Sequence, residues 1–243
     1  MQQQSVDYFD SQERLVAQLL YDETVKGQQP AVIVFPAFEG CGEFVIDYGR
    51  RLVKAGFVAF VADMYGNGKV ADTLASCFQL VSPFVQDRRL TRRRACLALD
   101  TVAKLTSVDT HRIGSVGFCF GGMCVLEVAR SGAALKVGIG AHAMLAKSDL
   151  PTERIQAHLM LLQGYQDPMV PAVDSLREFA EEMESAQAKD WVFTLFSDAK
   201  HSFTDPRTGT YDPDKEADMG RAYHPVAAAR TFRYAVDFLK EIL

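Results

Sequence analysis

The chain has 243 residues, of which 48% are hydrophobic and 23% charged, with a formal net charge of −5. This composition is typical of a globular protein with one large domain, and the acidic balance excludes the general positive field of a nucleic-acid-binding protein. No apolar run approaches the roughly 18 residues that cross a bilayer, and the N-terminus lacks the basic and apolar regions of a signal peptide. We therefore expect a cytoplasmic protein without a membrane partner.

The first third of the chain alternates between strand and helix patterns. Arg14–Tyr21 alternates enough to be a strand at an antiparallel end of the sheet. Ala31–Phe35 and Phe57–Ala62 are continuous apolar runs, typical of strands buried on both faces. Between them, Glu43–Ala55 has helical spacing and is stopped by a glycine. The Asp63–Gly68 segment is predicted to be a loop because of its glycines and asparagine.

The same alternation continues to the C-terminus. Residues from about Ala71 to Leu105 are helical in two pieces, with a break expected near Pro83. The later strands are Arg112–Phe118, Leu135–Ala141, His158–Gln163 and Trp191–Phe196, and the later helices are Gly121–Arg130, Pro171–Ala186 and Pro225–Leu243. Alternating strands and helices predict a single α/β domain over residues 1–243, with a mostly parallel sheet covered by helices on both faces.

Parallel α/β sheets bind ligands at the carboxyl ends of their strands, and three chemically reactive residues follow predicted strands. Cys119, Asp167 and His201 occur in the order nucleophile, acid, base, which is the order of the α/β-hydrolase folds. A thiol attacks only as thiolate, so it needs a base; an imidazole can take and return that proton. A carboxylate fixes the tautomer of the imidazole and stabilises its charged form.

Cys119 lies in the sequence V-G-F-C-F-G-G-M, whose Gly-x-Cys-x-Gly spacing is that of a nucleophile elbow. Glycines allow a tight turn from strand to helix where other side chains would clash. The N–H of Phe120, at the start of the helix, and that of Gly40, after the first buried strand, are the expected oxyanion donors. The alternative is a packed glycine turn in which the cysteine only fills space.

Each partner residue also has a structural alternative. Asp167 precedes a proline and could simply form a turn, with Asp198 and Asp205 as competing acids. His201 could be a surface loop histidine, and His142, which also ends a strand, is a much less favoured candidate for the base. His142, Tyr65, Asn67 and Phe203 are expected to line the substrate pocket.

Two further patterns have structural interpretations. The basic run from Arg88 to Arg94 is expected to be a solvated helix face, with an anion clamp or partner surface as the alternative. The five cysteines are an odd number without secretory features or a C-x-x-C pair, so we expect neither a disulfide framework nor a zinc site. A regulatory disulfide between Cys41 and Cys119 stays open.

The motifs together resemble the dienelactone hydrolase family of α/β-hydrolase folds, over nearly the whole chain. The similar segments are G-F-C-F-G-G at Cys119, G-Y-Q-D-P at Asp167, A-K-H-S-F at His201, F-P-A-F-E-G at Glu39 and A-D-M-Y-G-N-G at Asp63. The resemblance implies a Cys-His-Asp triad that cleaves small-molecule esters or lactones through a thioester, without a cofactor. It also implies that Glu39 contacts the resting thiol and helps to deprotonate it.

The sequence departs from the family where dienelactone-cleaving members hold the substrate carboxylate with two arginines. The matching positions hold Asn67 and Asp205, so dienelactone is not a favoured substrate unless Arg207 or the 88–94 run compensates. The polar segment from Asp205 to Tyr223 is expected to overhang the pocket.

The leading hypothesis is therefore an ester or lactone hydrolase that is a monomer or small homo-oligomer. The alternatives are a low-turnover binding or thiol-sensing protein on the same fold, and a thioesterase or acyltransferase that uses the same triad.

Overall fold

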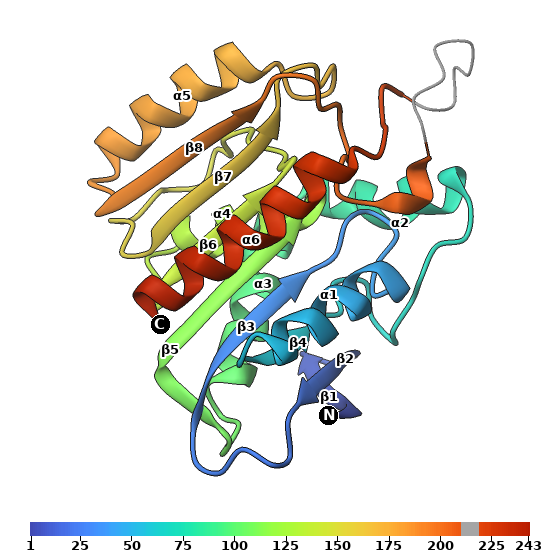
Figure 1. The fold of residues 1–243 in the computed structure, drawn as a ribbon, viewed down its shortest axis with the longest axis vertical. Helices are drawn as coiled ribbons and strands as arrows, with labels where there is room; N and C mark the ends of the chain where they lie inside the picture. Colours follow the sequence, from blue (N-terminus) through green and yellow to red (C-terminus); the bar gives the residue numbers. More distant parts are fainter. Residues whose placement is uncertain (210–218) are drawn as a thin grey trace.

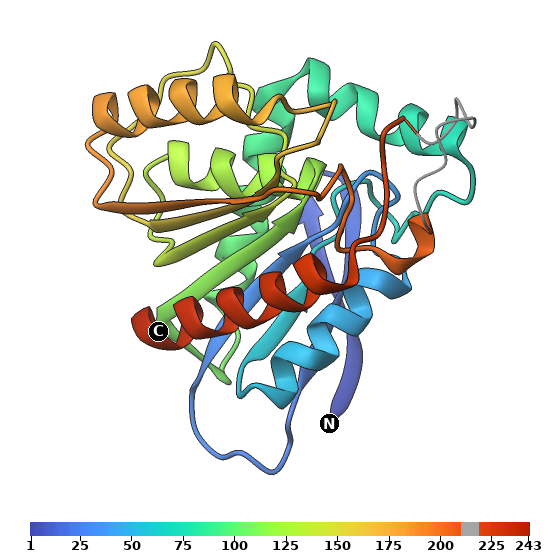
Figure 2. The same cartoon turned by 45° about the horizontal axis from the view of Figure 1, so that its top comes forward.

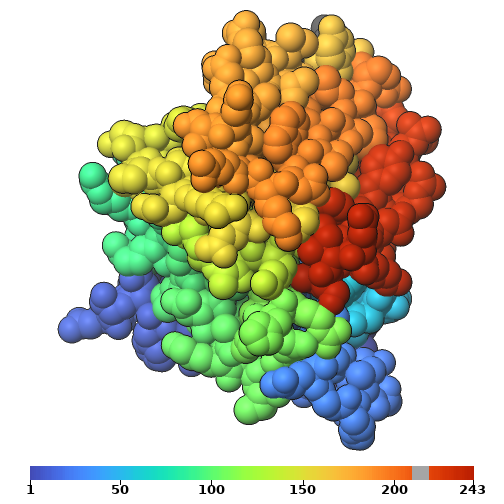
Figure 3. Space-filling view, turned by 90° about the vertical axis from the view of Figure 1, so that its left-hand side faces the viewer, coloured from blue at the N-terminus to red at the C-terminus, as the bar shows by residue number. Residues whose placement is uncertain are grey.

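The computed structural model describes residues 1–209 and 219–243 and contains one eight-stranded sheet in the order β1-β2-β4-β3-β5-β6-β7-β8 (Figure 1). The strands are β1 (Gln2–Asp10), β2 (Glu13–Tyr21), β3 (Gln29–Phe35), β4 (Val58–Val61), β5 (Val108–Phe118), β6 (Val137–Ala141), β7 (His158–Gly164) and β8 (Asp190–Phe196). The six strands from β4 across to β8 are parallel, whereas β2 runs antiparallel to both of its neighbours, β4 and β1, at one end. The N-terminal strands and the β8 end lie at opposite ends of the molecule (Figure 3).

Helices cover both faces of this sheet. They are α1 (Glu43–Lys54), α2 (Leu74–Gln86), α3 (Arg88–Val102), α4 (Phe120–Arg130), α5 (Ala172–Ser185) and α6 (Pro225–Ile242), with a short 3₁₀ turn at Pro206–Thr208. Figure 2 shows α1 and α6 on one face and α3, α4 and α5 on the other. Each face buries its own hydrophobic cluster, as expected for a parallel sheet. No described helix is both long and apolar enough to cross a bilayer.

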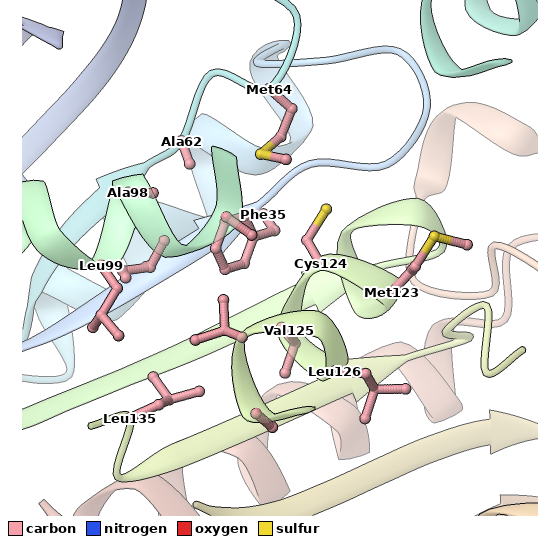
Figure 4. Packing of buried hydrophobic residues seen from close by; sticks show 14 of the residues in the cluster. Phe35, Ala62, Met64, Ala98, Leu99, Met123, Cys124, Val125, Leu126 and Leu135 are labelled. Carbon is pink, nitrogen blue, oxygen red and sulfur yellow. The ribbon is translucent and has the colours of Figure 1, made fainter. Parts of the chain in front are cut away.

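The helix α4 is buried on all sides because it lies between the sheet and α3. All eleven of its residues are buried. Figure 4 shows Cys124 of this helix beside Phe35 of β3, and Val125 of α4 and Leu99 of α3 belong to the same buried cluster. This packing fixes the helix whose first residue follows Cys119.

The predicted α/β architecture is confirmed, with two differences in its elements. β1 was not predicted because its burial alternates weakly: only Tyr8 and Asp10 of its nine residues are buried. The break between α2 and α3 lies at Asp87 rather than at Pro83, which is inside α2. Asp87 ends one helix and caps the next, because its carboxylate accepts the N–H groups of Arg89 and Leu90.

The basic run on α3 is not the solvated face that the sequence predicts. Four of its arginines reach two buried carboxylates at 2.8 to 2.9 Å. The pairs are Arg88 and Arg92 with Glu127, and Arg93 and Arg94 with Asp10. Of these four, only Arg93 keeps more than half of its side chain exposed, whereas the fifth arginine, Arg89, is exposed to solvent. The arginines therefore join α3 to α4 and to β1, and they do not compensate for the missing carboxylate-binding arginines.

Candidate active site

Cys119 occupies a strained turn between β5 and α4. Its backbone has φ 52° and ψ −112°, a left-handed region that L-residues rarely adopt. A Cβ at Gly117 would lie 2.0 Å from the Gly121 carbonyl oxygen, and one at Gly121 would lie 2.2 Å from the Phe35 carbonyl oxygen. Only glycine fits both positions, so the elbow brings the start of α4 directly against the end of β3. Such strain persists where the surrounding structure holds it.

The carboxylate that meets His201 is Asp167. His201 Nδ1 lies 2.7 Å from Asp167 Oδ2, and because an ionised carboxylate only accepts, Nδ1 carries the proton. The other oxygen, Oδ1, accepts the backbone N–H groups of Met169 and Val170 at 2.8 and 3.1 Å. The side chains of His201 and Asp167 are each 1% exposed, so the pair is shielded from water.

The competing acids are held elsewhere. Asp198 is mostly exposed and pairs with His224 at 3.0 Å. Asp205 binds the guanidinium of Arg207 and accepts its backbone N–H. Neither has a described bond to His201.

The second ring nitrogen of His201 faces the elbow. Burial lowers the pKa of this imidazole, but the negative charge of Cys119 and the hydrogen bond to Asp167 outweigh it and raise the pKa to about 10. Within the described part of the chain, Nε2 has no hydrogen bond of ordinary geometry, so the sulfur approaches the ring without closing one. Apo sites often hold such contacts loosely. The arrangement favours a protonated, positively charged ring at His201.

The two expected oxyanion donors differ in the structure. Phe120 is the first residue of α4, so its N–H has no carbonyl partner within the helix. The N–H of Gly40 instead donates to the carbonyl of Ala37 at 3.2 Å, closing a turn. Gly40 has φ 90°, and a Cβ there would lie 2.5 Å from the Lys69 carbonyl oxygen. The N–H of Gly40 is thus engaged within its own turn when no substrate is bound.

Glu39 binds an arginine rather than the thiol. Its Oε1 accepts from Arg207, which also bonds Asp205, while its Oε2 is buried without a hydrogen-bond partner in residues 1–209 or 219–243. These groups border a cavity of about 300 Å³ that Arg221 and Cys77 also line.

Arg221 is the cation that sequence reasoning missed. Its guanidinium lies over the Phe38 ring, 5.3 Å from the centroid, and its Nε has no hydrogen-bond partner among the described residues. The segment around Arg221 forms a parallel bridge with His201. No local signal identified this arginine, because it lies in no predicted strand or helix and its contact with Phe38 is between residues far apart in the sequence. Residues 210–218 of the segment that was expected to overhang the pocket lie outside the described residues.

The candidate pocket residues fall into two groups. His142 packs edge-on against His201 with ring centroids 5.2 Å apart, and its Nε2 lies 2.7 Å from Thr204 Oγ1. Burial, followed by the charge of His201, holds the pKa of His142 well below its ordinary 6.5, so this ring is neutral. Tyr65 donates to the carbonyl of Phe38 at 2.9 Å, beneath the Glu39 loop.

The other two candidates point elsewhere. Phe203 is completely buried and packs against His142 and Phe196, so it supports the site from the core. Asn67 is exposed, and its amide donates to Glu13 on β2 at 3.2 Å. The structure therefore ties Asn67 to the neighbouring hairpin rather than to Cys119.

The remaining cysteines are free thiols. Cys41 is buried and its thiol donates to the Ala62 carbonyl at 2.8 Å, so it is not paired with Cys119. Burial raises the pKa of Cys41 and of Cys124 well above the ordinary thiol value. Among the described residues, no group of three or more His, Cys, Asp or Glu side chains is arranged to hold a metal ion.

Several known proteins are similar to this chain in sequence or in fold. A probable 2-oxo-3-(5-oxofuran-2-ylidene)propanoate lactonase from Bradyrhizobium sp. is 28% identical over 226 residues, covering 89% of this chain and 85% of that protein. A putative carboxymethylenebutenolidase from Escherichia coli strain K12 is 26% identical over 228 residues, covering 88% and 78%. The crystal structure of a dienelactone hydrolase-like promiscuous phosphotriesterase from metagenomic libraries is 33% identical, with a TM-score of 0.90 over 99% of this chain and 98% of that one.

Residues 16–243 match the dienelactone hydrolase family as a whole. That range begins in β2 and ends at the last residue, so it includes Cys119, Asp167 and His201. The chain belongs to the dienelactone hydrolase family, whose members are hydrolases of the α/β-hydrolase superfamily that act on ester and lactone bonds.

Proposed function

We propose that this protein hydrolyses carboxylic esters or lactones through a covalent thioester on Cys119. The observation that carries the proposal is the buried 2.7 Å hydrogen bond between His201 and Asp167. It orients the imidazole of His201 so that its other nitrogen faces the elbow cysteine. The strained turn at Cys119 and the order of the three residues along the chain support it. The chemistry needs no cofactor, and we propose a small molecule as substrate and the cytoplasm as the location.

In the first step the Cys119 thiolate attacks the carbonyl carbon, and the carbonyl oxygen takes the negative charge. The N–H of Phe120 donates to that oxygen at the start of α4. The bond to the leaving oxygen then breaks while His201 gives that oxygen its proton, releasing an alcohol or opening a lactone. His201 next takes a proton from water, the hydroxide attacks the thioester, and the acid leaves with the thiolate restored.

Gly40 supplies the second donor if its hydrogen bond to Ala37 is shared or exchanged. At 3.2 Å this bond is at the long end of the ordinary range. An oxyanion is a stronger acceptor than a neutral carbonyl, so a bound tetrahedral intermediate competes well for this N–H.

Glu39 couples substrate binding to activation of the thiol. In the free protein its carboxylate is held by Arg207. A negatively charged or strongly polar substrate group that binds Arg207 releases the Glu39 carboxylate, which then accepts the thiol proton in any molecule where Cys119 is protonated.

The substrate class follows from the charges beside Glu39. Asn67 and Asp205 stand where the family's carboxylate-binding arginines are expected, but Arg207 and Arg221 both line the adjacent cavity. We therefore propose esters or lactones that carry an anionic or strongly polar group. The lactonase name of the Bradyrhizobium relative supports lactones, and the phosphotriesterase relative makes neutral phosphotriesters a second class to assay.

The test is hydrolysis of p-nitrophenyl acetate and of a small lactone by wild type, Cys119→Ala and Cys96→Ala. Cys96 is a matched control because it is a free thiol on α3 that contacts Ser131 and does not line the cavity beside Glu39. We expect loss of turnover in Cys119→Ala and near-wild-type turnover in Cys96→Ala. Equal activity in Cys119→Ala and wild type would refute the proposal. Stoichiometric acylation without turnover would favour a sensing protein, and faster capture of the acyl group by added thiol than by water would favour an acyltransferase.

A further inference from the structure

A second cavity, of about 510 Å³, lies on the other side of the elbow from Glu39. The sheet order places β3 and its Glu39 loop on one side of β5, and β6 and β7 on the other. The cavity is bounded by the segment that follows β6, the segment that follows Asp167, and the first turns of α5. We propose that it binds the uncharged, apolar chain of the ester, whether acyl or alkyl; this inference rests on the proposed hydrolase function.

The walls of this cavity are directly attached to the triad. The N–H of Met144 donates to the carbonyl of Cys119 at 3.1 Å. The N–H groups of Met169 and Val170 are those that hold Asp167 Oδ1. A chain bound between Met144 and Met169 therefore lies beside the backbone that orients both the nucleophile and the acid.

The side chains of the lining select against a negative charge. Its apolar lining includes Met144, Met169, Val170, Pro171 and Phe179. The charged groups of the lining are mostly acidic: Glu178, Glu181 and Glu182 come from α5, and Lys147 comes from the segment after β6. The cavity beside Glu39 is lined by acidic side chains as well, but it also holds Arg207 and Arg221, and the Nε of Arg221 has no hydrogen-bond partner among the described residues. The polar end of a substrate is thus directed to the arginines and its apolar chain to the methionines.

Buried ion pairs hold the cavity open before any ligand binds. Arg130 donates to the Leu145 carbonyl at 3.1 Å, and Arg88 donates to that of Ala146 at 2.9 Å. Arg130 also makes a bidentate pair with Glu182, which neutralises that carboxylate. The segment after β6 is therefore fixed to α3, α4 and α5. It loses little conformational entropy when a ligand binds, so binding carries a small entropic cost.

The experiment compares Ser175→Trp, which fills the cavity, with Ser185→Trp, an exposed position on the same helix outside the lining. One series uses p-nitrophenyl esters from acetate to octanoate, and a second uses acetates of alcohols from methanol to hexanol. In wild type we expect kcat/KM to rise by up to roughly fourfold for each methylene buried, in at least one series. Ser175→Trp should lower the ratio of long-chain to acetate activity at least tenfold, and Ser185→Trp should leave it unchanged.

A binding measurement separates this inference from the hydrolase proposal. In Cys119→Ala with 13C-labelled methionine methyl groups, hexanamide should shift the Met144 and Met169 resonances, and Ser175→Trp should abolish the shifts. Normal p-nitrophenyl acetate hydrolysis without a chain-length effect in either series would overturn the subsite alone. Absence of the methyl shifts would also overturn it, whereas shifts without any hydrolysis would support the subsite and refute the hydrolase.

Discussion

The substitution Asp167→Asn removes one charge from the triad and changes little else in size. The amide oxygen can still accept the two backbone N–H groups that Oδ1 accepts, so the loop is expected to keep its shape. The amide nitrogen then faces His201 Nδ1 and can only donate. The imidazole must therefore carry its proton on Nε2, the atom that should accept the proton of Cys119.

The expected loss can be estimated from the site. The pKa of His201 is about 10, compared with an ordinary value of 6.5, which corresponds to roughly 5 kcal/mol in favour of the protonated ring. Both the charge of Cys119 and the bond to Asp167 supply this preference, against the cost of burial. If the amide removes about half of it and fixes the wrong tautomer, kcat should fall about 10³- to 10⁴-fold, as in other triads.

The assay is the pre-steady-state burst of p-nitrophenol, which reports acylation, together with steady-state kcat. Asp198→Asn is the matched control because Asp198 is exposed and bound to His224. We expect a slow burst in Asp167→Asn and a normal burst in the control. A rate within tenfold of wild type in Asp167→Asn, or a large loss in Asp198→Asn, would refute the assignment of Asp167 as the orienting acid.

Three other predictions concern stability. Because the folded pKa of His201 is raised, the stabilising contribution of its protonated ring is complete below about pH 6.5 and is lost as pH rises through about 10. The difference in unfolding free energy between wild type and Asp167→Asn, measured by urea denaturation, should therefore shrink over that range. A difference that grows with pH would contradict this. Glu182→Gln should lower the free energy of unfolding by about 3 to 5 kcal/mol, because it leaves the buried guanidinium of Arg130 partly unpaired. Glu181→Gln, at an exposed position on the same helix, should lower it by less than about 0.5 kcal/mol. Equal losses in the two variants would argue against the buried pair. Gly117→Ala should cost more than about 3 kcal/mol or prevent folding, because its Cβ would lie 2.0 Å from a carbonyl oxygen. Its control, Gly27→Ala, has a positive φ but no atom within 4 Å of the added Cβ, and should cost about 1 kcal/mol in thermal melts. A larger loss of stability in Gly27→Ala than in Gly117→Ala would contradict the elbow geometry.

Much of the fold was predictable because the buried strands are strong local signals. Ala31–Phe35, for example, lies within β3, and every strand predicted after it was found within a few residues. β1 escaped prediction because an exposed edge strand has no buried face to impose a pattern, and its pairing with β2 depends on a turn at Ser11. The helix break lies at Asp87 because the carboxylate of Asp87 caps α3, whereas the proline that predicted the break, Pro83, is accommodated inside α2.

The candidate site was predictable where each residue follows a strand. The parallel sheet brings those positions to one edge, and the structure places Asp167 against His201 as the sequence order suggested. The pairing of Glu39 with Arg207 was not predictable, since those residues are 168 positions apart and no periodicity connects them. The outward orientation of Asn67 depends on a positive φ of 57°, which the neighbouring glycines do not specify.

The central claim is that Cys119 becomes acylated and is then regenerated by water. Its most direct test is rapid quenching of the protein with p-nitrophenyl acetate at successive times, followed by intact-mass and peptide mass spectrometry alongside product release. We predict one acetyl group, located on Cys119, that appears before steady-state turnover and disappears when substrate is exhausted. Turnover without an acetyl group on Cys119, or an acetyl group on another residue that accounts for the rate, would contradict the account.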